Sequence, residues 1–132
     1  FDGVCPTCSG PVEGRLECCP DHDPEGCERC GLRFGTLARF RCRLCKYFGG
    51  GNLKRSALCH PAVTAFYENR GVSTRVRADD FGSAKRIHAL VYEYGVERLS
   101  ESPLRVAVTV PFDGDEIRLT FDETVRVVDV RN

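Results

Sequence analysis

The second half of the chain alternates apolar and polar residues in the way that β-strands do. Apolar side chains occupy every second position in two runs, 104–110 and 117–121, and Asp113-Gly114 lies between them. An Asp-Gly pair between two alternating runs is a strong signal for a hairpin. A third run follows at 125–130, and residues 96–100 could supply a further strand. The pattern predicts an antiparallel meander of three or four strands.

Two segments ahead of the meander carry the spacing of helices instead. Residues 60–71 begin with His60-Pro61 and end at Gly71, which suits proline in the first turn and glycine just past the end. Asp79 or Asp80 can cap a second helix that ends at Tyr94. Two helices on one face of a meander sheet give an α+β fold.

The first 58 residues or so have a much weaker apolar pattern. Short strands are expected at 11–16 and 36–44, and the glycine-rich stretch 49–52 reads as a flexible loop. A segment so poor in Val, Ile and Leu needs help to fold, and a bound metal is the usual help. The sequence therefore predicts a small β-rich, cysteine-rich module at 1–58 and an α+β domain at 59–132.

The metal ligands expected in this module come in closely spaced pairs. Three CxxC pairs and one CxxH pair fall within about forty residues, which suits tetrahedral zinc. The pairs are Cys5 with Cys8, Cys19 with His22, Cys27 with Cys30, and Cys42 with Cys45. Disulfides are the alternative, but they need an oxidising compartment, the chain shows no secretory signal, and nine cysteines is an odd number.

Four pairs can hold two zinc ions by pairing in sequence, by nesting or by interleaving. Interleaving is favoured. The first and third pairs then have the spacing of a zinc ribbon, and the second and fourth pairs supply four ligands for the other ion. The predicted sets are Cys5, Cys8, Cys27 and Cys30 for one ion, and Cys19, His22, Cys42 and Cys45 for the other. Cys18 could replace Cys19, Cys59 is expected to be a small buried residue, and His60 could cap the helix, pack, or act as a ligand.

Charge adds a second candidate surface. The net charge is zero, yet residues 1–28 hold seven acids and one base while residues 29–59 hold eight bases and no acid. One interpretation is that the two halves neutralise each other, and the other is that the basic half contacts nucleic acid through arginines and interleaved aromatic rings. The candidate contacts are Arg39, Arg41, Arg43, Lys46, Lys54 and Arg55.

Strand alternation sharpens this second candidate. Arg39, Arg41 and Arg43 should project from one face, with Phe40, Cys42 and Leu44 on the other, toward metal and core. The competing interpretation places the aromatic rings in a small core around the ligands and leaves the arginines in solvent. A thiol-based switch, in which oxidation releases the metal, is a third interpretation.

No enzyme is expected. Both zinc sets are closed by four protein ligands, which is typical of structural sites. The sequence has no HExxH motif, no glycine-rich phosphate loop and no plausible Ser/His/Asp arrangement.

Four motifs resemble a known family: the C-terminal domain of winged-helix, ArsR-like transcriptional regulators of halophilic archaea. The motifs are Cys42-Arg-Leu-Cys45-Lys, His60-Pro-Ala-Val-Thr-Ala-Phe-Tyr, Arg77-Ala-Asp-Asp-Phe81 and Asp113-Gly-Asp-Glu-Ile-Arg-Leu-Thr120, followed by a terminal Val127-Val-Asp-Val130. The resemblance implies a non-catalytic accessory, sensory or assembly domain with structural zinc. It also implies a cytoplasmic location, contact with DNA through a winged helix upstream of this chain, at most weak contact through the chain alone, a homodimer as one candidate assembly, and no membrane partner.

Overall fold

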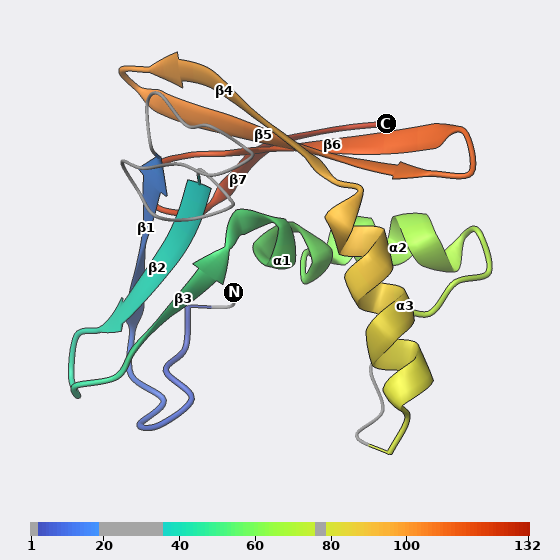
Figure 1. Ribbon diagram of the computed structural model, residues 1–132. Coiled ribbons are helices and arrows are strands. Elements are labelled where there is room, and N and C mark those ends of the chain that lie inside the picture. Colours follow the sequence, from blue (N-terminus) through green and yellow to red (C-terminus); the bar gives the residue numbers. More distant parts are fainter. Residues whose placement is uncertain (1–2, 19–35, 76–78) are drawn as a thin grey trace, which may run out of the picture.

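The computed structural model describes residues 3–18, 36–75 and 79–132, and these form an α+β fold with two antiparallel sheets (Figure 1). The predicted fold class is confirmed. In chain order the elements are β1 (Val12–Cys18), β2 (Thr36–Cys42), β3 (Phe48–Asn52), α1 (Leu53–Leu58), α2 (Pro61–Glu68), α3 (Phe81–Tyr92), β4 (Gly95–Glu101), β5 (Leu104–Phe112), β6 (Asp115–Phe121) and β7 (Val127–Arg131).

The small sheet has the order β1-β2-β3. β1 and β2 pair antiparallel along their whole lengths, with Val12 opposite Cys42 and Cys18 opposite Thr36. The residues just before β1 and those just after β2 therefore meet at one end of this sheet. Both strands were predicted, although β2 ends at Cys42 rather than at residue 44.

The predicted flexible loop at 49–52 is wrong, because these residues belong to β3. Phe48 pairs with Arg41 and Asn52 pairs with Leu37, so the glycines between them continue the backbone ladder. A Cβ on Gly50 would come within 2.6 Å of the Ala38 carbonyl oxygen. Glycine is depleted in strands for lack of a side chain to pack, but here its small size lets the edge strand approach closely.

Helix α1 was not predicted. The Asn52 side chain accepts a hydrogen bond from the Lys54 N–H and caps this helix of six residues. Three of its own residues, Leu53, Ala57 and Leu58, are buried. Cys59 follows at the end of α1 and is exposed, so its predicted burial is wrong.

Helices α2 and α3 lie close to the two predicted helical segments. His60 caps α2, because its Nδ1 accepts a hydrogen bond from the Ala62 N–H at 3.1 Å, and Pro61 begins the helix. Asp80 caps α3 through a 3.2 Å bond from the Ser83 N–H. Residues 72–75 between these helices form neither helix nor strand, and residues 76–78 lie outside the described part of the chain.

The larger sheet is a four-stranded meander of order β4-β5-β6-β7, as the alternation predicted. Val108 pairs with Leu119 in the middle of the sheet. Alternate residues of β5 and β6 face inward and are buried: Val106, Val108, Val110, Ile117, Leu119 and Phe121. In Figure 1 this sheet lies across the top, and the helices and the small sheet lie below it.

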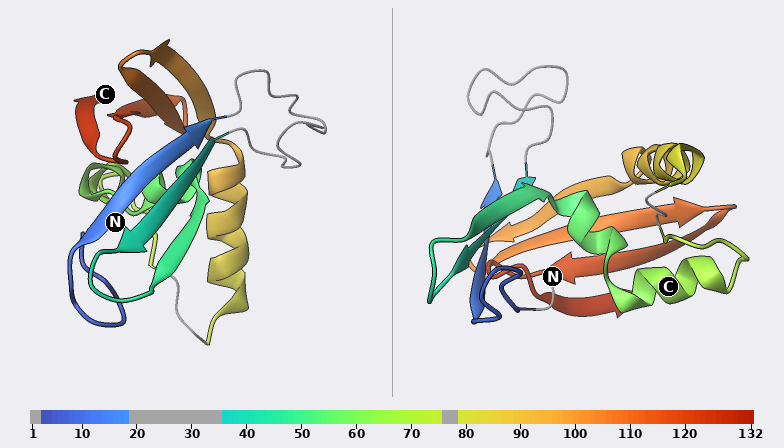
Figure 2. Two further views of the ribbon diagram at one scale, coloured as in Figure 1. Left: turned by 90° about the vertical axis from the view of Figure 1, so that its left-hand side faces the viewer. Right: turned by 90° about the horizontal axis from the view of Figure 1, so that it is seen from below.

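One apolar core joins the small sheet, the helices and the meander. Leu16 and Ala38 of the small sheet belong to the same buried cluster as Val63, Ile87 and Leu119. Two views in Figure 2 show the small sheet beside the helices on one side of the meander. The division into domains 1–58 and 59–132 stays a prediction, and the packing shows that the two parts share their core.

None of the helices in the described ranges combines the length and apolar character needed to cross a membrane.

Candidate metal centre

The first cysteine pair sits in a tight turn ahead of β1. The N–H of Ser9 donates to the Cys5 carbonyl oxygen, and the N–H of Cys5 donates to the Gly10 carbonyl oxygen, each at 2.9 Å. Ser9 closes the turn with a φ of 61°, in the left-handed region. The N–H of Thr7 points at the Cys5 Sγ at 3.4 Å. The backbone thus presents the sulfur of Cys5 and stabilises its thiolate form.

The second pair sits in a similar turn just after β2. The N–H groups of Leu44 and Cys45 both donate to the Cys42 Sγ at 3.4 Å. The N–H of Tyr47 donates to the Cys45 Sγ at 3.3 Å, and the N–H of Cys42 closes the turn on the Tyr47 carbonyl oxygen at 3.1 Å. Each turn therefore combines two thiols with backbone donors aimed at sulfur.

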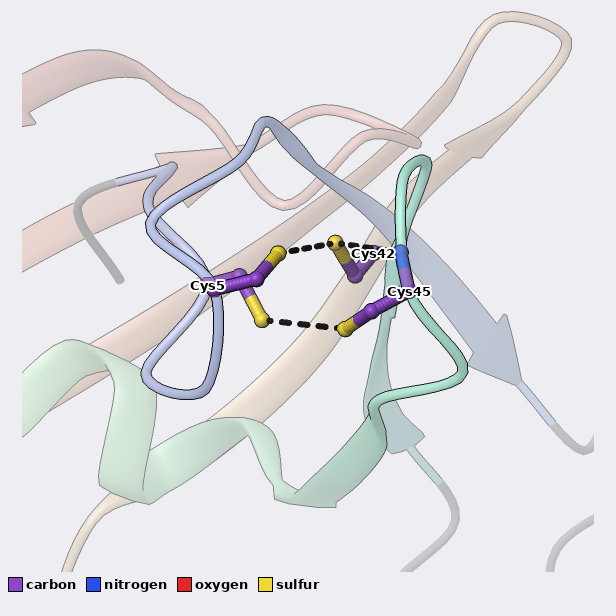
Figure 3. A group of neighbouring side chains, drawn as sticks. Cys5, Cys42 and Cys45 are labelled. Carbon is purple, nitrogen blue, oxygen red and sulfur yellow. Dashed lines mark hydrogen bonds between the residues drawn. The ribbon is translucent and has the colours of Figure 1, made fainter.

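The two turns meet at the same end of the small sheet. The N–H of Arg43 donates to the Pro11 carbonyl oxygen at 3.0 Å and holds the turns together. A Cβ at Gly10 would lie 2.8 Å from the Leu44 Cδ1 and 3.2 Å from the Cys8 Sγ, so glycine at this position lets the two turns approach closely. Cys5 faces Cys42 and Cys45 across the site (Figure 3).

The four sulfurs have the spacing of a metal tetrahedron. The Sγ atoms of Cys5 and Cys45 lie 3.6 Å apart, and those of Cys8 and Cys42 lie 3.5 Å apart. All four Sγ atoms lie within 4.8 Å of one another. Zinc–sulfur bonds of about 2.3 Å in a tetrahedron imply sulfur–sulfur edges of about 3.8 Å. A disulfide needs about 2.05 Å, and these cysteines are free.

The pKa values of the thiols in the cluster also favour the binding of a cation between them. The N–H of Cys45, together with that of Leu44, lowers the pKa of Cys42 to about 6. The N–H of Tyr47 alone would lower the pKa of Cys45, but burial and the neighbouring Cys42 thiol outweigh it and raise that pKa to about 12. Four thiolates this close repel one another, and a divalent cation bound between them would offset that electrostatic repulsion.

The predicted interleaving of the ligand pairs is wrong. The structure brings Cys5 and Cys8 together with Cys42 and Cys45, which is the outer set of the nested arrangement. The cause is the antiparallel pairing of β1 with β2, which separates the Val12–Cys42 end from the Cys18–Thr36 end by about 20 Å at 3.4 Å per residue. Cys18, the last residue of β1, is at the end of the strand away from the four sulfurs.

The remaining predicted ligands, Cys19, His22, Cys27 and Cys30, lie outside the described residues, as does Cys18's side chain. Cys59 and His60 are not in the four-sulfur cluster. The Nδ1 of His60 is engaged as a helix cap, so the capping role is confirmed.

The predicted nucleic-acid contacts lie in three places. Arg39 and Arg41 lie on β2 and Arg43 on the second cysteine turn, and all three line one groove. Lys46 is exposed beyond Cys45. Lys54 and Arg55 of α1 reach α3 instead: the Lys54 Nζ donates to the Tyr92 carbonyl oxygen, and the Arg55 guanidinium contacts the His88 Nδ1, each at 3.4 Å.

The predicted alternation along β2 holds until the strand ends. Cys42 is buried and Phe40 packs against the core. Leu44, however, is 74% exposed, so its predicted inward orientation is wrong. It lies in the turn after β2, where the period of two no longer applies. Phe48, one of the aromatic residues that the competing interpretation places in a small core, is 62% exposed.

Two arginines of the same groove were not predicted from the sequence. Arg15 lies opposite Arg39 in the β1–β2 pairing, and Arg126 lines the groove from the turn between β6 and β7. Arg15 lies on the same face of the sheet as Arg39, and a correct pairing of β1 with β2 would have revealed this from the sequence. Arg126 carries no local signal, because only the tertiary fold brings it there.

Comparison with known proteins gives one match. Neither the curated proteins nor the solved structures include a match to this chain. Residues 1–127 match the family described as "Domain of unknown function (DUF7351)". With nearly its whole length matched, the chain belongs to the DUF7351 family.

Proposed function

We propose that this chain is a non-catalytic zinc-binding domain that serves as an accessory, sensory or assembly part of a transcriptional regulator. One observation carries the metal proposal: four thiols from two backbone turns converge within 4.8 Å. Tetrahedral sulfur coordination suits zinc, with iron as the other metal of that preference. Zinc is proposed because both ligand pairs have the CxxC spacing of structural zinc sites.

The proposed zinc has a structural task at this position. Cys5 and Cys42 are buried, with 1% and 2% of their surfaces exposed. A metal held by both turns would cross-link residues 5 and 45 and fix the start of β1 against the end of β2. Ligand binding would then contribute directly to the folding free energy of the small sheet, since a preformed site does not exist in the unfolded chain.

A non-catalytic role fits the donor set. Four protein ligands close a tetrahedral zinc and leave no position for water or substrate. The two histidines of the described ranges have other partners, His60 with the Ala62 N–H and His88 with Arg55.

The regulatory part of the proposal is supported by the motif resemblance to winged-helix, ArsR-like regulators. In that setting the winged helix would read DNA, and this domain would contribute assembly or signal input. The proposal also includes a second zinc, on sequence grounds. Once the first and last pairs share one ion, the remaining ligand pairs are Cys19 with His22 and Cys27 with Cys30.

The metal proposal is tested by metal analysis of the purified chain and of serine variants. Cys5→Ser and Cys45→Ser should each lose one zinc per chain relative to the parent. Cys59→Ser is the matched control, because Cys59 is exposed and outside the cluster, and it should keep the parent's zinc content. Unchanged zinc in Cys5→Ser and Cys45→Ser contradicts the site, and iron in place of zinc contradicts the choice of metal.

The accessory role is tested by titrating duplex DNA with the chain alone. Weak binding without sequence preference is expected. Tight, sequence-dependent binding that is abolished by Arg39→Ala, Arg41→Ala and Arg43→Ala together would refute this role and favour direct reading of DNA by the basic segment.

A further inference from the structure

The outward face of the small sheet, opposite the core, collects arginines from neighbouring strands. Side chains at directly paired positions share a face. Arg15 is paired with Arg39, and Arg41 with Phe48. Arg43 continues the row into the second cysteine turn. We call the surface formed by Arg15, Arg39, Arg41, Arg43 and Phe48 the arginine face.

Only part of this positive charge is neutralised. Arg39 pairs with Glu17 at 2.6 Å and Arg43 with Glu13 at 2.9 Å, both exposed. Arg15 and Arg41 form no ion pair within the ranges 3–18, 36–75 and 79–132. Arg15 moreover lies directly across from Arg39, and like charges at such positions destabilise a sheet. A bound anion would relieve that repulsion.

An aromatic ring stands in the middle of these charges. Phe48 is 62% exposed, and the Arg39 guanidinium carbon lies 5.9 Å from the centre of its ring. The next outward position along β3 is Gly50, paired with Arg39, and it has no side chain to cover the ring. The face therefore offers a flat apolar platform bordered by guanidinium groups.

The arginine face is also one wall of a groove of about 970 Å³. The other wall comes from the meander and includes Leu104, Thr124 and Arg126. Arg126 adds a further positive charge to the groove, and Glu123 adds a negative charge on the same wall. A groove of this kind can hold an extended chain with regularly spaced negative charges.

We propose that the arginine face and its groove bind single-stranded nucleic acid. Arg15, Arg41 and Arg126 contact phosphates, and an unpaired base stacks on Phe48. The exposed ring distinguishes this ligand from an acidic peptide, which needs only the arginines. It also distinguishes it from a duplex, whose bases are already stacked. This function goes beyond the proposed zinc-binding role and requires no chemistry at the metal.

The test uses fluorescence anisotropy with the full chain and a labelled single strand of about 15 nucleotides. Phe48→Leu removes the ring but keeps an apolar side chain, and should weaken binding about tenfold. Arg15→Ala with Arg41→Ala removes two phosphate contacts and should flatten the salt dependence of log K by about 1.4. Arg86→Ala, at an exposed position of α3 outside the groove, is the control that removes one arginine charge elsewhere, and it should bind like the parent.

Several results would overturn the proposal. The first is the absence of saturable binding to the single strand. The second is equal binding by Phe48→Leu and the parent, together with competition by poly-glutamate, which identifies an acidic polypeptide as the partner. The third is tighter binding to the matching duplex than to the single strand. Zinc content measured on each variant separates loss of this surface from loss of the metal centre.

Discussion

The backbone N–H of Leu16 in β1 donates to the carbonyl oxygen of Glu123, in the turn between β6 and β7, at 2.9 Å. This bond ties the edge strand of the small sheet to the meander. Leu16 and Val125 belong to the same buried cluster on either side of it. The cysteine-rich part of the chain therefore rests on the larger sheet and contributes to a common core.

Replacement of Gly14 tests how closely β1 must approach the turn between β6 and β7. A Cβ at Gly14 would lie 2.6 Å from the Thr124 carbonyl oxygen, a backbone atom that cannot turn away. Gly14→Ala should therefore push β1 from the turn and lower the free energy of unfolding by about 1–3 kcal/mol. Urea denaturation followed by circular dichroism measures the change.

The matched control for Gly14 is Gly51 in β3 of the same sheet. A Cβ at Gly51 would meet no atom within 4 Å. Gly51→Ala should leave stability unchanged or raise it by up to about 1 kcal/mol, since alanine restricts the unfolded chain. Equal losses in the two variants would show that the cost lies in glycine replacement generally and not at the joint.

A buried pair of hydroxyl groups joins α2 to the short connection between α3 and β4. The Tyr67 and Tyr94 hydroxyl oxygens lie 2.7 Å apart. Tyr94→Phe leaves the Tyr67 hydroxyl buried without this partner and should cost about 1–3 kcal/mol. The double variant Tyr67→Phe, Tyr94→Phe should cost less than the sum of the two single changes. Strict additivity in a double-mutant cycle would argue against the bond.

The same pair should limit stability in alkali. Burial raises the pKa of Tyr67 and raises that of Tyr94 strongly. The unfolded chain loses these protons near its ordinary pKa of about 10, while the folded chain keeps them. The free energy of unfolding should thus hold below about pH 10 and fall as pH rises further. The double phenylalanine variant should show a shallower fall; an identical fall would mean that other groups cause it.

The histidine cap of α2 should respond to acid. Burial lowers the pKa of His60, and its Nδ1 must be unprotonated to accept the Ala62 N–H. The cap's contribution is therefore present above the unfolded pKa of about 6.5 and lost as pH falls through the lower folded value. His60→Ala should cost about 1 kcal/mol at neutral pH. His60→Asn should retain a cap and abolish the acid dependence in pH-resolved thermal unfolding.

Removal of the metal should act first on the small sheet. Chelation should expose the amides of β1 and β2 to hydrogen exchange, because the two turns beyond them lose their cross-link. Amides of β5 and β6 should keep much of their protection, since their aliphatic core does not contain the ligands. Equal protection of both sheets after chelation would contradict this order of events.

The sequence predicted most of the larger sheet and its helices, because these elements have strong periodicity and explicit caps. The runs at 104–110 and 117–121, the Pro61 start of α2 and the Asp80 cap of α3 are all local signals. β3 and α1 escaped prediction for the opposite reason. The glycines of β3 have no propensity for strands, and the six residues of α1 form a helix only where Leu53, Ala57 and Leu58 can be buried.

The candidate site was predicted in part. The CxxC spacing singled out Cys5, Cys8, Cys42 and Cys45 as candidate ligands without showing which pairs meet. That choice depends on the antiparallel pairing of Val12 with Cys42, which is not local information. The exposure of Leu44 was missed as well, because strand alternation was extended past the end of β2, while the exposure of Phe48 was one of two interpretations that the sequence left open.

An anomalous difference map at the zinc absorption edge, from crystals of this chain, tests the central claim most directly. We predict a peak about 2.3 Å from each of the four Sγ atoms of Cys5, Cys8, Cys42 and Cys45. A map with no peak between these sulfurs, or with a zinc that joins Cys42 and Cys45 to Cys19 and His22, would contradict the account.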